Sequence, residues 1–228
     1  MKSLLFLTLL TTIMTLLPPS PLYPKLESQL KDFEKEFQNI PEERKENLQD
    51  LADYIRRKRA NGKSVLLNFI CTHNSRRSHI SQLWAQAAAA YYGIDGVQCY
   101  SGGTEATAFN PRAVKAMREA GFMIATVKEG NNPVYEVRYS DEAPALNVFS
   151  KKYEEGGNPT TGFAAIMTCS EADQNCPIVR GADYRIGLPY EDPKAFDGTP
   201  EEEAMYRERV HQIGVEIGYA FSLAASVK

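Results

Sequence analysis

The sequence predicts an α/β fold: a flavodoxin-like three-layer sandwich with a parallel sheet of about four strands, plus an N-terminal helical extension. Apolar runs rich in β-branched and aromatic residues predict four buried strands, at residues 65–70, 97–101, 162–168 and 184–188. Helical patterns follow at residues 80–92, at 110–120 and from 199 onward. Because strands that alternate with helices form a parallel sheet covered on both faces, this order predicts the three layers.

Local signals place the ends of several elements. Pro111 follows Asn110 at the start of one helix and Gly121 ends it, since proline suits the first helical turn and glycine the position after the last. Thr199-Pro200 and two following glutamates predict the start of a long C-terminal helix. Residues 130–159 are irregular, and we expect an insertion beside the sheet in which residues 134–138 form an edge strand.

Three segments divide the chain: residues 1–24 are an apolar leader and Pro-rich linker, 25–62 the N-terminal helical extension, and 63–228 the main domain. The apolar run from 4 to 17 suits the core of a signal peptide and is too short to span a bilayer. It has one lysine before it and no small-x-small cleavage site after it, and Met14 is an alternative start. We therefore expect a cytoplasmic protein with no stable membrane association; export through a real signal peptide is the alternative.

Composition excludes some classes of function. The formal net charge is −3 and hydrophobic residues make up 43% of the chain, so this is a globular protein without the basic face that a general nucleic-acid binder needs. The four cysteines allow two disulfides, but 228 residues form a core large enough to be stable without them. We expect a reduced protein whose thiols do chemistry, with no cofactor.

The loop from Cys71 to Ser78 carries the strongest chemical signal. It leaves a predicted strand and enters a predicted helix, so its backbone N–H groups and the helix N-terminus form an anion cradle. Cys71 at the base of this cradle becomes a nucleophilic thiolate, and Arg77 grips two oxygens of a phosphate or arsenate. Ser78 donates a hydrogen bond to the sulfur, and Asn74 accepts a left-handed backbone. The expected oxyanion-binding residues are Thr72, His73, Asn74, Ser75, Arg76 and Arg77.

The alternative for Cys71 is a buried core cysteine at a strand end. Asp192-Pro193 follows the fourth predicted strand, where a loop can return to the same site. A carboxylic acid there protonates a leaving oxygen, so Asp192 is a candidate general acid. The alternative for Asp192 is an ordinary turn residue.

Residues 70–78, Ile-Cys-Thr-His-Asn-Ser-Arg-Arg-Ser, resemble the active-site loop of low-molecular-weight protein tyrosine phosphatases and of thioredoxin-coupled arsenate reductases that share their fold. Segments 101–104, 110–113 and 191–193 also fit, and the resemblance covers residues 64 to 225. Two residues depart from the family pattern: His73 replaces the usual glycine and Arg76 a common cysteine. The resemblance implies a catalytic domain that acts on arsenate or on phosphomonoesters.

Cys169 and Cys176 resemble the second and third cysteines of the thioredoxin-coupled reductases. This implies that Cys71, Cys169 and Cys176 reduce arsenate in a relay, and that a thioredoxin-like reductant restores the last disulfide. The alternatives are a phosphatase with two half-buried cysteines, and a zinc site. We expect no metal, because the spacing is not Cys-x2-Cys and the histidines are not paired with it.

Overall fold

The computed structural model describes residues 22–176 and 178–226. Its central sheet contains β1 (Val65–Cys71), β2 (Val97–Gly103), β6 (Phe163–Met167) and β7 (Ala182–Gly187). The strand order is β2-β1-β6-β7 and every neighbouring pair is parallel, which confirms the predicted flavodoxin-like sheet of four strands.

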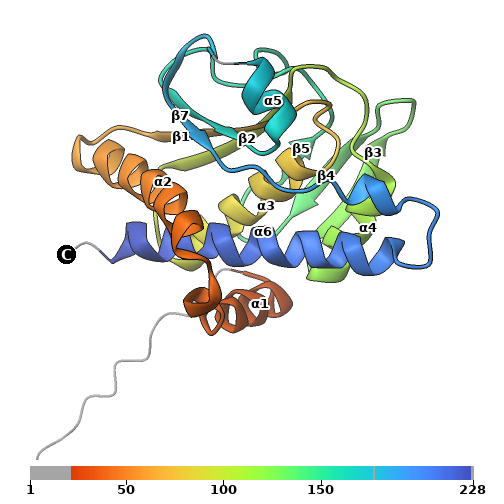
Figure 1. The fold of residues 1–228 in the computed structure, drawn as a ribbon, viewed down its shortest axis with the longest axis horizontal. Coiled ribbons are helices and arrows are strands. Elements are labelled where there is room, and N and C mark those ends of the chain that lie inside the picture. The colour runs from red at the N-terminus through yellow and green to blue at the C-terminus, as the bar shows by residue number, and fades with distance from the viewer. Residues whose placement is uncertain (1–21, 177, 227–228) are drawn as a thin grey trace, which may run out of the picture.

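Both faces of the central sheet are covered. Along β1, Leu67 and Phe69 join one hydrophobic core while Ile70 joins a second, as the period of two in a strand requires. The first core is completed by five helices, α1 (Pro24–Glu34), α2 (Glu42–Ala60), α3 (Arg77–Tyr91), α4 (Pro111–Ala120) and α6 (Glu202–Ala225). The second core is smaller and includes Ala172 of the short helix α5 (Ser170–Asn175). The result is three layers, visible in Figure 1.

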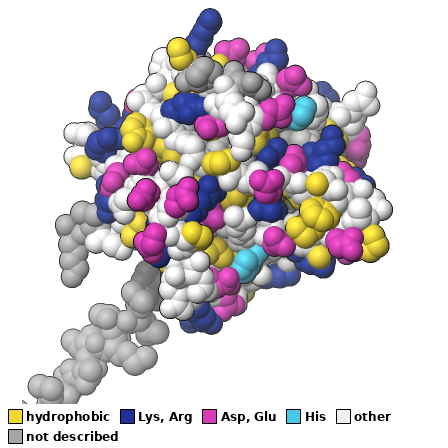
Figure 2. All heavy atoms as spheres, in the orientation of Figure 1, with side chains coloured by type: hydrophobic (Ala, Val, Ile, Leu, Met, Phe, Trp, Pro, Cys, Tyr) yellow, Lys and Arg dark blue, Asp and Glu magenta, His cyan; other side chains and the backbone are white. Residues whose placement is uncertain are grey.

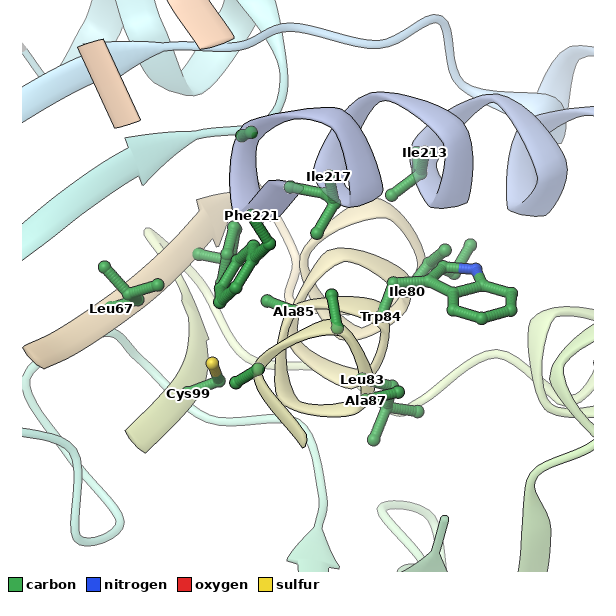
Figure 3. Packing of buried hydrophobic residues seen from close by; sticks show 14 of the residues in the cluster. Leu67, Ile80, Leu83, Trp84, Ala85, Ala87, Cys99, Ile213, Ile217 and Phe221 are labelled. Carbon is green, nitrogen blue, oxygen red and sulfur yellow. The ribbon is translucent and has the colours of Figure 1, made fainter. Parts of the chain in front are cut away.

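Helices α3 and α6 pack against each other in the first core. Figure 3 shows Ile213, Ile217 and Phe221 of α6 facing the α3 side chains. The Trp84 indole donates to the Val210 carbonyl across this contact at 3.0 Å. A Cβ on Gly214 would lie 2.5 Å from the Phe33 ring, so α6 needs a glycine there to let α1 approach.

Residues 134–138 do form a strand, but the prediction that it is an edge strand is wrong. A second, antiparallel sheet of order β3-β4-β5 contains β3 (Met123–Lys128), β4 (Val134–Arg138) and β5 (Leu146–Val148), so β4 is its central strand. Tyr135 and Val137 are buried while their neighbours are half-buried. This alternation predicts a one-sided strand but says nothing about its partners, and Met123 and Val127 of β3 are exposed hydrophobics that a core pattern does not predict.

Helices α1 and α2 occupy the predicted N-terminal extension and pack against α6, as Figure 1 shows. The division of the chain at residue 62 stays a prediction, and the predicted leader lies outside the described residues. Within residues 22–176 and 178–226, no helix combines the length and the apolar character needed to cross a bilayer. Lys and Arg side chains are interspersed with Asp and Glu on the face drawn in Figure 2.

Candidate active site

Cys71 is the last residue of β1, between the carboxyl ends of β2 and β6. In the sheet, β1 has β2 on one side and the later strand β6 on the other, so the strand order reverses at β1. The loop after Cys71 therefore lies at the switch point where open parallel sheets bind ligands. The thiol is buried, and its Sγ lies 3.1 Å from Ser78 Oγ. Asn74 Nδ2 donates to the same Ser78 oxygen at 2.9 Å, which leaves the Ser78 hydrogen free to point at the sulfur.

Asn74 adopts a left-handed backbone with φ of +44°, as its residue type allows. Its side-chain oxygen accepts from the backbone N–H of Lys151, and the Ser150 hydroxyl donates to the carbonyl of His73. A Cβ on Gly103 would lie 2.7 Å from the nitrogen of Asn74, so this glycine lets β2 pack on the loop. Ser150 and Lys151 were missed by the sequence analysis, because no local pattern marks contacts made 77 residues away.

The loop has unused hydrogen-bond donors. None of the backbone N–H groups of residues 73–76 donates to an acceptor in the described part of the chain. The Nε of Arg77 is also buried without a partner among the described residues. Buried donors without acceptors are costly in a folded protein, so these groups suit a ligand with several acceptor oxygens.

The two terminal nitrogens of Arg77 have hydrogen-bond partners. Its Nη1 donates to the Tyr190 carbonyl at 2.9 Å and its Nη2 to Asp192 Oδ2 at 2.7 Å. The Asp192 side chain also accepts from the Lys194 N–H and so caps a short 3₁₀ helix, Pro193–Phe196. Asp192 therefore contacts the Arg77 guanidinium and also stabilises a turn. Its carboxylate occupies one end of the Arg77 guanidinium fork.

Arg76 contacts side chains outside the Cys71–Ser78 loop. Its Nε donates to the Tyr206 hydroxyl at 2.8 Å, and its guanidinium lies 3.7 Å from Asp197 and 3.8 Å from Asp192. The Arg76 side chain thus ties the loop to α6, which contains Tyr206. At the exposed mouth, His73 Nε2 lies 3.6 Å from a Glu105 carboxylate oxygen.

Cys169 and Cys176 flank α5. Cys169 is fully buried as the N-cap of α5; its sulfur accepts from the Ala172 N–H at 3.4 Å and lies 3.4 Å from Thr72 Oγ1. Thr72 is next to Cys71 in the chain. Cys71 and Cys169 belong to the second core, and Cys176 packs against it. Cys176 is half-buried at the other end of α5. The Thr72 hydroxyl donates to Glu171, a contact that the sequence analysis did not anticipate.

Three further titratable groups near the loop are buried. His79 is buried with Nδ1 3.0 Å from Ser101 Oγ, and burial followed by the charge of Lys151 lowers its pKa well below 6.5. Burial alone lowers the pKa of Lys151 to about 8. Cys99 lies in β2, and burial raises the pKa of its thiol, as expected for a core cysteine. No group of three His, Cys, Asp or Glu residues suited to a metal occurs in the described ranges.

The sequence is similar to proteins of known families. Residues 66–132 match the family model of low molecular weight phosphotyrosine protein phosphatase. The arsenate reductase of Bacillus subtilis is 31% identical over 153 residues, which cover 67% of this chain and 89% of that protein. This chain belongs to the low-molecular-weight phosphotyrosine phosphatase family, together with such arsenate reductases. It is accordingly an enzyme of the arsenate reductase or the phosphatase type.

Further proteins align with this chain. The arsenate reductase of Bacillus licheniformis is 31% identical over 150 residues, 65% of this chain and 89% of that one. Among solved structures, a low molecular weight protein tyrosine phosphatase from T. tengcongensis aligns with a TM-score of 0.46 and 18% identity, over 68% of this chain and 97% of that one. The family model begins at residue 66, after α2.

Proposed function

We propose that this protein reduces arsenate to arsenite with three thiols, Cys71, Cys169 and Cys176, and that a thioredoxin-like dithiol regenerates it. The observation that carries the proposal is the contact of 3.4 Å between the Cys169 sulfur and Thr72 Oγ1, which places a second thiol beside the Cys71 loop. Hydrolysis of a phosphomonoester needs one cysteine. Reduction needs two electrons, which a pair of thiols supplies when it becomes a disulfide.

In the first step the Cys71 thiolate attacks arsenic, a sulfur–arsenic bond forms, and one arsenate oxygen leaves as water. The Arg77 fork and the unpartnered N–H groups of residues 73–76 are the proposed ligands of the remaining oxygens. Once the oxyanion takes Arg77, Asp192 loses its nearer cation partner and keeps only Arg76 at 3.8 Å, and its carboxyl group is the proposed donor of the proton that the leaving oxygen needs.

In the second step Cys169 attacks the Cys71 sulfur. A disulfide forms, the sulfur–arsenic bond breaks, and its electron pair stays on arsenic, which leaves as arsenite. The Ala172 N–H at the start of α5 stabilises the attacking thiolate. Cys176 then attacks Cys169 and frees Cys71 as a thiolate. Since seven helical residues span about 10.5 Å, and a disulfide needs Cα atoms within about 7 Å, α5 must unwind in this step.

The test is turnover of arsenate with thioredoxin, thioredoxin reductase and NADPH, measured beside hydrolysis of an aryl phosphate. We expect many arsenite molecules per enzyme and a Cys169–Cys176 disulfide when the reductant is withheld. A protein that hydrolyses the aryl phosphate but never forms this disulfide with arsenate is a phosphatase. The phosphatase is the second candidate function, because hydrolysis needs only Cys71, Arg77 and Asp192.

Asp192→Asn tests the proposed proton donor. We expect hydrolysis of aryl phosphates with poor leaving groups to fall by about 10²-fold or more, and hydrolysis of those with good leaving groups to fall much less. The variant also frees Arg77 from its carboxylate partner, so inorganic phosphate should bind at least as tightly as to the wild type. An equal loss for both kinds of ester would mean that Asp192 is not the proton donor and has only a structural role in the turn, where it accepts from the Lys194 N–H.

A further inference from the structure

We propose that Arg44 of α2, in the N-terminal extension, is a positioning residue for the oxyanion site. In this proposal Arg44 fixes the ring of Tyr190, and the backbone carbonyl of Tyr190 fixes Arg77. The inference rests on the proposed function, because it assigns Arg77 to the oxyanion. It concerns a helix outside the family model, which begins at residue 66.

Tyr190 is the link between the extension and the site. Its carbonyl accepts from Arg77 Nη1 at 2.9 Å, and its own N–H donates to the Thr168 carbonyl at 3.1 Å. Asp192, two residues later, accepts from the other end of the Arg77 fork. When an oxyanion displaces Asp192, the Tyr190 carbonyl is the contact that still orients the guanidinium.

The Arg44 guanidinium lies over the ring of Tyr190. The ring is 4% exposed, and the Arg44 guanidinium carbon lies 4.6 Å from the ring centroid. Arg44 Nε also donates to Glu216 Oε2 of α6 at 2.7 Å, with the two side chains 15% and 6% exposed. Burial, and then the charge of Glu216, raises the pKa of the Tyr190 hydroxyl well above 10, so the ring stays neutral beneath the cation.

This arrangement restricts where the ring can lie. A cation over an aromatic face attracts it more strongly when both are removed from water. A guanidinium that must reach Glu216 and also lie over the ring has few positions open to it, and so limits where the buried ring can lie. Small displacements of substrate-positioning groups have large effects on binding and rate. In Figure 1 α2 runs obliquely to α6, against which it packs, and this contact brings the pair together.

The experiment uses a variant that removes both buried charges, Arg44→Met with Glu216→Gln, because removing Arg44 alone leaves a buried carboxylate unpaired. Its matched control is Lys45→Met with Glu42→Gln, which removes a neighbouring ion pair whose carboxylate is 87% exposed. We expect the dissociation constant of inorganic phosphate, by titration calorimetry, to rise about ten-fold. KM for an aryl phosphate should rise in parallel, with kcat changed by less than about three-fold. The control should match the wild type.

Tyr190→Leu is the second variant, since it removes the ring but keeps the backbone carbonyl and the Arg44–Glu216 pair. It should show a similar rise in both constants. Arg77→Lys is measured beside them as the reference for the site. If Arg77→Lys weakens phosphate binding while both test variants bind like the control, the Arg44 proposal is wrong and the proposed function stands. If Arg77→Lys also binds phosphate normally, the oxyanion site is misplaced and both proposals fall.

Discussion

Cys71→Ser is expected to abolish arsenate reduction and aryl phosphate hydrolysis together, each by at least about 10⁴-fold. A serine hydroxyl is far less acidic than a thiol, so serine at this position stays protonated and unreactive. Oxygen is smaller than sulfur and Ser78 remains as a hydrogen-bond partner, so the buried site should keep its fold. Activity is measured with both substrates, and folding by thermal unfolding.

The matched control for Cys71→Ser is Cys99→Ala. Cys99 is also a buried strand cysteine, but it has no anion cradle, and burial raises the pKa of its thiol. The control should keep both activities to within about three-fold, as expected for a change outside the site. Turnover of either substrate by Cys71→Ser above about 1% of the wild-type rate would mean that another group attacks the substrate.

The Cys71 loop was predictable because its signals are local. A buried strand, a loop of defined length and a helix start are adjacent in the sequence, and Asn74 and Ser78 lie within the same eight residues. The structure places Asn74 in the predicted left-handed conformation and Ser78 beside the sulfur. The parallel sheet was predictable for a similar reason, since alternating strands and helices admit few arrangements.

Contacts between distant segments were not predictable. Arg76 reaches Tyr206 across 130 positions, and nothing within the loop shows that its side chain leaves the anion cradle. The same holds for Arg44 and Glu216, 172 positions apart, because Arg44 in α2 and Glu216 in α6 each look like an ordinary exposed charge in the sequence. The second sheet was missed because β3 exposes Met123 and Val127, which hides the strand from an argument based on burial.

Cys176→Ala is expected to remove multi-turnover arsenate reduction and to leave aryl phosphate hydrolysis within about three-fold of the wild-type rate. Hydrolysis ends when water attacks the Cys71 adduct, whereas reduction ends when thiols attack sulfur. Without Cys176, one arsenite is released and the enzyme stops as a Cys71–Cys169 disulfide. Peptide mapping by mass spectrometry after one turnover detects that pair, and Cys99→Ala again serves as the control.

Cys169→Ala stops the same reaction one step earlier. The Cys71 adduct should then form without releasing arsenite, because the thiol beside Thr72 is missing. Cys176 cannot replace it while α5 stays folded, since the helix separates Cys176 from the Cys169 end that touches Thr72. The two variants thus order the relay: a stalled disulfide in Cys176→Ala and no disulfide in Cys169→Ala. Arsenite release from Cys169→Ala at the wild-type rate would contradict this order and assign the attack on Cys71 to another thiol.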